Sequence, residues 1–201
     1  MLGTLDFRSV QQKSTDVTAL RAYLQQLVGE PFLHVRFSYG DELTLHFGEP
    51  QKPKLKKLAH LTEGSYVVTA RASSWYFKTA NGIAVTMAAS AADACLPDGF
   101  VPLSTEQIER GQLAQPGVRV IAADASVVRS GATESGFACS LLLADGSSIL
   151  IVPEPSGDVN GGGGADDVAD WEVFTPYDRY LRVGPGLGWA YLPSRGPGSS
   201  L

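Results

Sequence analysis

The sequence contains only two cysteines, Cys95 and Cys139, among its 201 residues. They lie far apart and match neither a C-x-x-C redox motif nor the spacing of a zinc knuckle. A disulfide-rich scaffold and a cysteine-based metal site are therefore not indicated. We expect two reduced thiols that are at least partly buried.

Long apolar runs are lacking as well. No stretch approaches the roughly 20 residues of a membrane-spanning helix, and residues 1–8 lack the basic start and apolar segment of a secretory signal. We expect a cytoplasmic protein without a membrane partner. The chain also has no G-x-S-x-G or H-E-x-x-H pattern, so the templates of nucleophilic and metal-dependent hydrolysis are not matched. No cofactor is predicted.

An excess of positive charge is missing too, because the net charge is −5. An acidic chain does not attract phosphate over its whole surface, so a nucleic-acid partner is not expected. One local basic cluster consists of Lys52, Lys54, Lys56 and Lys57. It lacks interleaved aromatic residues, and we interpret it as solvated loop charge, with a polyanion or protein contact as alternatives.

Glycine and proline are abundant, with 22 and 12 residues, which favours short strands and turns over a helical bundle. One helix is predicted over residues 16–28, where apolar residues recur at helical spacing and Ser14-Thr15-Asp16 offers a cap. A capping box at Ser104 predicts the start of a second, short helix. The predicted strands are residues 32–38, 42–47, 65–70, 75–79, 83–87, 118–121, 126–128, 137–143, 148–152, 171–175 and 180–183.

The hairpin around Gly40 has a register that can be argued from its pattern. A three-residue loop pairs Val35 with Leu45 and keeps one face apolar, whereas a two-residue loop would mix the two faces. The preferred register places His34 opposite His46 on a polar face that should be wet. The later hairpin, residues 137–152, is apolar on both faces, so it should be central or covered by a helix or a partner chain.

Two parts of the chain follow the same order of elements. Aligning Gly40 with Gly146, and Trp75 with Trp171, superimposes the apolar positions of their strands, which predicts an internal repeat of a helix and two hairpins. The expected boundaries are an N-terminal arm 1–13, a first half 14–90, a link 91–103, a second half 104–193 and a disordered tail 194–201.

The predicted fold is α+β and mainly antiparallel β, because neither half can bury its apolar sheet face without the other. We expect the halves to pack as a sandwich or a partly open barrel. Trp75 and Trp171 open equivalent strands, and we interpret both as buried core anchors rather than platforms for a ligand.

His34 and His46 are the sharpest candidates for chemistry. Two imidazoles at cross-strand contact distance could bind zinc or a similar metal if one or two further ligands joined them. Asp41 or Glu42 lies near the same loop, and His60 is the remaining histidine. The alternative interpretation is a pair of solvent-facing polar residues.

The acidic stretch that contains Asp166, Asp167 and Asp170 follows a glycine-rich loop. Its carboxylates lack the alternating ligand pattern of a calcium loop. We interpret the three aspartates as candidates for electrostatic contact with a basic protein partner.

Residues 137–189 contain Ala144-Asp145-Gly146-Ser147, Trp171-Glu172-Val173-Phe174 and Leu181-Arg182-Val183-Gly184. This pattern resembles small β-rich bacterial domains of unknown function, some of them grouped with toxin-immunity-like proteins. The resemblance implies a β-rich fold and carries over no catalytic residue.

Together these observations predict a bacterial protein that binds another protein without catalysis, with an immunity-like role as one form of that function. One alternative is a metal-dependent enzyme or small-ligand binder centred on His34 and His46. The other is a structural subunit of a homo-oligomer, which would bury the second hairpin against another copy.

Overall fold

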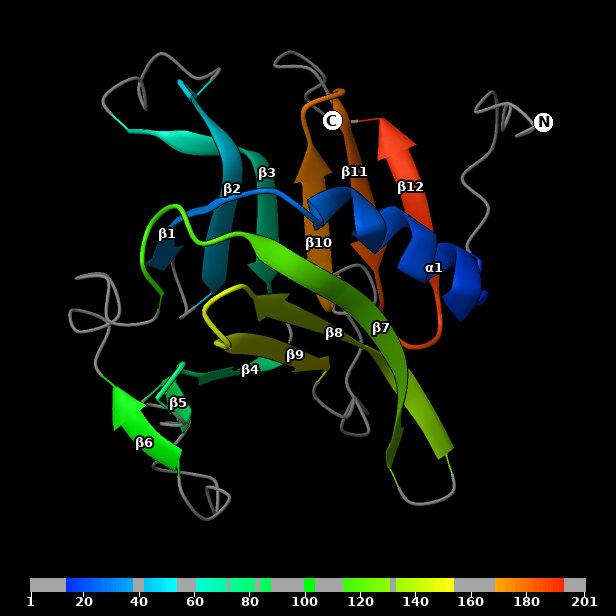
Figure 1. The fold of residues 1–201 in the computed structure, drawn as a ribbon. Coiled ribbons are helices and arrows are strands. Elements are labelled where there is room, and N and C mark those ends of the chain that lie inside the picture. The colour runs from blue at the N-terminus through cyan, green and yellow to red at the C-terminus, as the bar shows by residue number, and fades with distance from the viewer. Residues whose placement is uncertain are drawn as a thin grey trace.

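The structure is a computed structural model in which two β-sheets pack face to face (Figure 1). It describes residues 14–37, 42–53, 61–71, 73–81, 84–87, 100–103, 114–130, 133–153 and 169–193. Within these ranges, no helix has both the length and the apolar character needed to cross a membrane. The strands of one sheet run across those of the other.

The first sheet contains six strands, in the spatial order β1 (Phe32–Phe37), β2 (Leu43–Gln51), β3 (Glu63–Ala70), β10 (Trp171–Thr175), β11 (Arg179–Val183) and β12 (Trp189–Pro193). The second sheet has the order β6 (Phe100–Leu103), β5 (Ala84–Met87), β4 (Ser73–Lys78), β9 (Ser148–Pro153), β8 (Thr133–Leu143) and β7 (Val120–Ser130). All pairs are antiparallel except β5 with β6. The prediction of a mainly antiparallel β fold is confirmed, and the sheets do not close into a barrel.

Both sheets combine strands from the two halves of the chain. Strand β3 pairs with β10 in the first sheet, and β4 pairs with β9 in the second. The strand order is unchanged when β1–β6 are exchanged with β7–β12. The predicted internal repeat is nevertheless not confirmed. Hairpin β1–β2 lies at a sheet edge, whereas β8–β9, its counterpart when Gly40 is aligned with Gly146, lies inside a sheet.

The register predicted for the first hairpin is confirmed over most of its length. Val35 lies opposite Leu45, and His34 lies opposite His46. A bulge near the start of β1 places Phe32 opposite Phe47, where strict alternation predicts Leu33. The extra residue lets the strand bend toward β7, where the Phe32 amide donates to the Val118 carbonyl at 2.7 Å.

The core lies between the two sheets. One row of paired residues on the inner face of the first sheet consists of Val35, Leu45, Val68, Val173, Leu181 and Tyr191. From the second sheet come Phe77, Phe137, Leu141, Ile149 and Ile151, all almost fully buried. Trp75 and Trp171 are 4% and 0% exposed, which confirms them as core anchors. Cys139 is a buried free thiol, as expected, and Cys95 lies outside the described residues.

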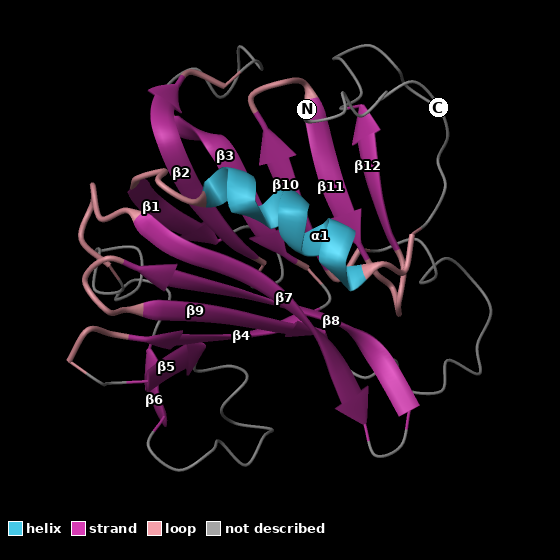
Figure 2. Ribbon diagram, turned by 45° about the vertical axis from the view of Figure 1, so that its right-hand side comes forward, coloured by secondary structure: helices cyan, strands magenta, loops and turns pink. Residues whose placement is uncertain are grey.

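The helix α1 (Val17–Leu24), extended by a 3₁₀ turn over Gln25–Leu27, protects an edge of the second sheet. Asp16 caps it by accepting from the Thr18 amide at 2.8 Å, as the sequence predicts. Arg21 and Gln25 donate to carbonyls of the edge strand β7, at 2.9 and 2.7 Å. These carbonyls would otherwise be open to pairing with another chain. The same helix crosses the first sheet at β10 and β11 (Figure 2).

The hairpin β8–β9 is central, as its apolar pattern predicts. Its inner face is buried, but Leu142 and Leu150 on its outer face are each 39% exposed. They stand next to serines in the paired strand, because Leu142 lies opposite Ser148 and Leu150 opposite Ser140. Water therefore reaches an apolar part of this face.

One hydrogen bond ties the two sheets together through the core. The Trp171 indole donates to the Phe137 carbonyl at 2.6 Å, and both residues are buried. We expect Trp171→Phe to lower the free energy of unfolding by about 2–3 kcal/mol, because it removes volume and leaves a buried carbonyl without a partner. Urea denaturation measures the change.

The matched control is Trp189→Phe, which removes a half-buried hydrogen bond of 3.0 Å to the Asp16 carbonyl. It should cost about 1 kcal/mol, since water can replace a half-buried partner. Equal losses in both variants would contradict the special role of Trp171.

Candidate functional site

The histidine pair lies on the outer face of the first sheet, with His34 half-buried and His46 buried. His46 is 3% exposed, so the prediction of a wet polar face is wrong at this position. The two rings stack with centroids 4.3 Å apart and planes 20° apart. The Gly64 amide donates to Nδ1 of His46 at 3.1 Å, which places the proton of the neutral ring on Nε2.

Burial decides the charge of both histidines. Desolvation lowers the pKa of His46 to about 3, and the neighbouring His34 and Arg36 act in the same direction. Desolvation also lowers the pKa of His34, with a smaller contribution from Arg36. Both rings are therefore neutral at pH 7 and available as hydrogen-bonding groups.

A metal site at this pair stays a prediction, with His34 and His46 as its two candidate ligands. The described residues contain no group of three or more His, Cys, Asp or Glu side chains placed to hold a metal ion. Glu42 instead forms an ion pair with Arg71 at 2.7 Å. His60 and Asp41 lie outside the described residues.

Asp170 is placed in the interior rather than in a surface loop. Asp170 is 5% exposed. Its main-chain carbonyl accepts hydrogen bonds from the Arg71 amide and the Ser73 hydroxyl, each at 2.9 Å. These bonds tie the start of β10 to the corner between β3 and β4. Burial raises the pKa of Asp170 to about 6. Asp166 and Asp167 lie outside the described residues.

A second buried acid, Glu172, lies on the outer face of the first sheet. It is 6% exposed, and its carboxylate lies 3.3 Å from Nε of Arg71. Desolvation raises the pKa of Glu172, while the positive charges of Arg71 and Arg182 oppose that shift. An ion pair with Arg71 thus holds this carboxylate within the fold.

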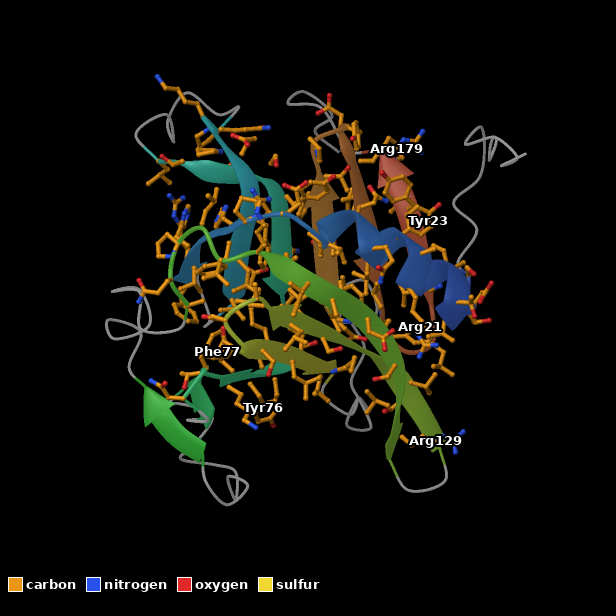
Figure 3. All side chains as sticks on the ribbon, in the orientation of Figure 1. Arg21, Tyr23, Tyr76, Phe77, Arg129 and Arg179 are labelled. Carbon is orange, nitrogen blue, oxygen red and sulfur yellow. The ribbon has the colours of Figure 1, made fainter. Side chains whose placement is uncertain are left out.

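A different feature has the character of a binding site, and the sequence did not reveal it. Four of the seven tyrosines gather with one arginine at the β11–β12 end of the first sheet. This tyrosine cluster consists of Tyr23, Tyr66, Tyr177, Tyr191 and Arg179. Figure 3 shows Tyr23 beside β12 and Arg179 near the upper end of the same strand.

Stacking fixes the geometry of the cluster. The Tyr23 ring lies 4.7 Å from the Tyr191 ring and 5.4 Å from the Trp189 ring, measured between centroids. The guanidinium carbon of Arg179 lies 5.5 Å from the centre of the Tyr191 ring, within the range of a cation–π contact. Tyr177 and Tyr191 both act electrostatically on Tyr66 and contribute to its raised pKa.

The cluster runs from the interior to the surface. Tyr66 is 7% exposed and Tyr177 is 68% exposed, with the other members half-buried. Desolvation raises the pKa of Tyr23 and of Tyr66. Their hydroxyls are consequently neutral at pH 7 and can donate as well as accept hydrogen bonds.

The members come from four separate places in the chain, and this explains why sequence reasoning missed them. Tyr23 is in α1, Tyr66 in β3, Tyr177 in the turn before Arg179, and Tyr191 in β12. Strand β12 itself was not predicted. The spacing of tyrosines along the chain carries no signal of their convergence, because it depends on the pairing of β3 with β10 and of β11 with β12.

No family model, curated protein or solved structure matches the chain. The role of this site is therefore inferred from its geometry.

The buried His46 predicts a loss of stability in acid. Its pKa is 6.5 in the unfolded chain and about 3 in the folded chain. Below pH 6.5 the unfolded state therefore binds a proton that the folded state excludes, and the loss continues until about pH 3. Comparing urea denaturation at pH 7 and pH 4, we expect His46→Asn to lose about 2 kcal/mol less stability than the native chain.

Asparagine is chosen because its side-chain oxygen can accept from the Gly64 amide without titrating. Other titrating groups act in both proteins and cancel in the difference. A pH dependence that is identical in the two proteins would show that His46 is protonated in the fold.

The buried Asp170 predicts a loss of stability at higher pH, opposite to the effect of His46. Its pKa is 3.8 in the unfolded chain and about 6 in the folded chain, so stability is lost as the pH rises from about 4 through 6. Asp170→Asn should raise the free energy of unfolding by about 2 kcal/mol at pH 7.5 and leave it nearly unchanged at pH 4. Thermal unfolding at both pH values provides the measurement. A variant that is less stable at pH 7.5 would reveal a stabilising partner for the carboxylate.

Proposed function

We propose that this chain is a non-catalytic protein that binds another protein through the tyrosine cluster. The observation that carries the proposal is the convergence of four tyrosines and Arg179 on one partly exposed place. Tyrosine, tryptophan and arginine dominate the binding energy of protein interfaces, because they combine a large apolar area with hydrogen-bonding groups.

The cluster is supported by the fold before any partner arrives. The Thr175 hydroxyl donates to the Arg179 carbonyl at 3.0 Å across the turn between β10 and β11. The same hydroxyl lies 3.5 Å from the Tyr191 hydroxyl. Side chains that are already ordered lose little conformational entropy on binding, and more of the contact energy then appears as affinity.

Tyr177 is the member that a partner would meet first. It stands in the turn Pro176–Asp178 with 68% of its surface exposed, and it acts electrostatically on the buried Tyr66. An exposed tyrosine ring next to partly buried tyrosines is suited to the centre of an interface. An immunity-like role is one form of such binding.

The exposed outer face of the second sheet favours a second candidate, a subunit of a homo-oligomer. Ile121, Leu142 and Leu150 are 52%, 39% and 39% exposed on neighbouring strands. Each of the two leucines stands beside a serine, so leucines of one copy could pack over serines of another. Light scattering on the native chain and on Leu150→Asp tests this: a dimer that the substitution dissolves would favour the candidate.

The tyrosine cluster is tested by comparing captured proteins. The native chain, Tyr177→Ala and the control Tyr76→Ala are immobilised and exposed to a lysate of cells that naturally produce the protein. Tyr76 is a half-buried tyrosine on β4, far from the cluster (Figure 3). We expect one protein to be captured by the native chain and by the control, with about tenfold or greater weakening in Tyr177→Ala.

The affinity for the captured protein is then measured with purified components. Circular dichroism establishes that both variants are folded. Capture that Tyr177→Ala leaves unchanged would contradict binding through the cluster.

A further inference from the structure

We infer that the tyrosine cluster receives an oxyanion, a carboxylate or a phosphate ester, attached to a flat apolar group, and that Arg179 holds the oxyanion. The inference rests on the proposed function and names the chemical group that a partner must present at the same site.

Arg179 differs from Arg21 and Arg71 in how its charge is used. Arg21 forms an ion pair with Asp124, and Arg71 with Glu42, each at 2.7 Å. Arg179 forms no ion pair in the part of the chain that the structure describes, and its guanidinium lies over the Tyr191 ring. Stacking fixes the plane of a guanidinium but leaves the N–H groups at its edge able to donate to a carboxylate or phosphate.

The hydroxyls of the tyrosines around Arg179 add hydrogen-bond donors. The phenol groups of Tyr23 and Tyr191 come from rings 4.7 Å apart, and Arg179 interacts electrostatically with Tyr23 as well as stacking on Tyr191. Hydrogen bonds from a neutral hydroxyl to an oxyanion are charge-assisted and stronger than those between neutral groups. One guanidinium with adjacent phenols is therefore a donor set for an oxyanion.

The tyrosine rings should favour an oxyanion attached to a flat apolar group over the bare ion. The chain has a net charge of −5, so long-range attraction does not favour an anion, and Asp178 and Glu30 lie close to the cluster in the chain or in space. Coulomb attraction by Arg179 is local and screened by salt. Apolar contact with the tyrosine rings must then contribute, and an oxyanion on a flat apolar group should bind better than the bare ion.

The experiment titrates the full chain with four probes by isothermal titration calorimetry at low salt. Phenyl phosphate and benzoate combine an oxyanion with a ring, inorganic phosphate lacks the ring, and benzyl alcohol lacks the charge. We expect binding of phenyl phosphate or benzoate, with weakening of about tenfold or more for the other two probes. The tighter of the two ring-bearing anions identifies the oxyanion.

Three variants assign the binding to Arg179. Arg179→Gln should weaken it about tenfold or more, Arg179→Lys should weaken it less, since a point charge is kept without the planar fork, and Arg129→Gln should leave it unchanged. Arg129 is an exposed residue of β7 on the opposite side of the molecule (Figure 3). In the native chain itself, the NMR signal of the Arg179 Nε–H should shift on saturation with the bound probe.

Two results would overturn the inference: no binding of either ring-bearing anion to the native chain, or binding that Arg179→Gln leaves unaltered while the Arg179 Nε–H signal stays in place. These outcomes are separate from the fate of the proposed function. If the chain captures a protein through Tyr177 and binds neither anion, the oxyanion inference is wrong and protein binding stands. If the anions bind and no protein is captured, the proposed protein binding is wrong and the oxyanion inference stands.

Discussion

The inner faces of the two sheets leave water by packing against each other and against helix α1, and the rest of this fold depends on that shared core. Strands from both halves of the chain contribute to each face, because β3 pairs with β10 and β4 with β9. The indole of Trp171 crosses the interior to the Phe137 carbonyl at 2.6 Å. The hydrophobic effect thus joins the two sheets into one core, and a buried hydrogen bond fixes their relative position.

The tyrosine cluster is a consequence of how this core ends. Helix α1 covers the β10–β12 side of the first sheet and meets it with Tyr23, which contacts Trp189 and Tyr191. Tyrosine suits this boundary because its ring can be buried while its hydroxyl remains in reach of water or a partner. The proposed binding site therefore costs the core little, since its rings also close the end of the sandwich.

The buried ionisable groups, in contrast, lower the free energy of unfolding over part of the pH range. Three of these groups are almost fully buried: His46 is 3% exposed, Asp170 5% and Glu172 6%. Burial lowers the pKa of the histidine and raises the pKa of both acids, so it favours the neutral form of each. The histidine disfavours folding in acid, whereas the two carboxyl groups disfavour it at higher pH. Because their signs differ, they narrow the pH range of greatest stability from both sides. The ion pairs of Arg71 with Glu42 and Glu172 offset part of this cost.

The sequence by itself determined the features that depend on neighbours along the chain. These are the helix capped by Asp16, the register that places Val35 opposite Leu45, the buried tryptophans and the mainly antiparallel β character. Periodicity encodes them because side chains alternate across a strand and recur along a helix face. Only the tertiary structure decided the burial of His46 and Asp170 and the gathering of the tyrosines with Arg179. Those outcomes depend on which distant strands pair and on what covers each face, and no local spacing records either.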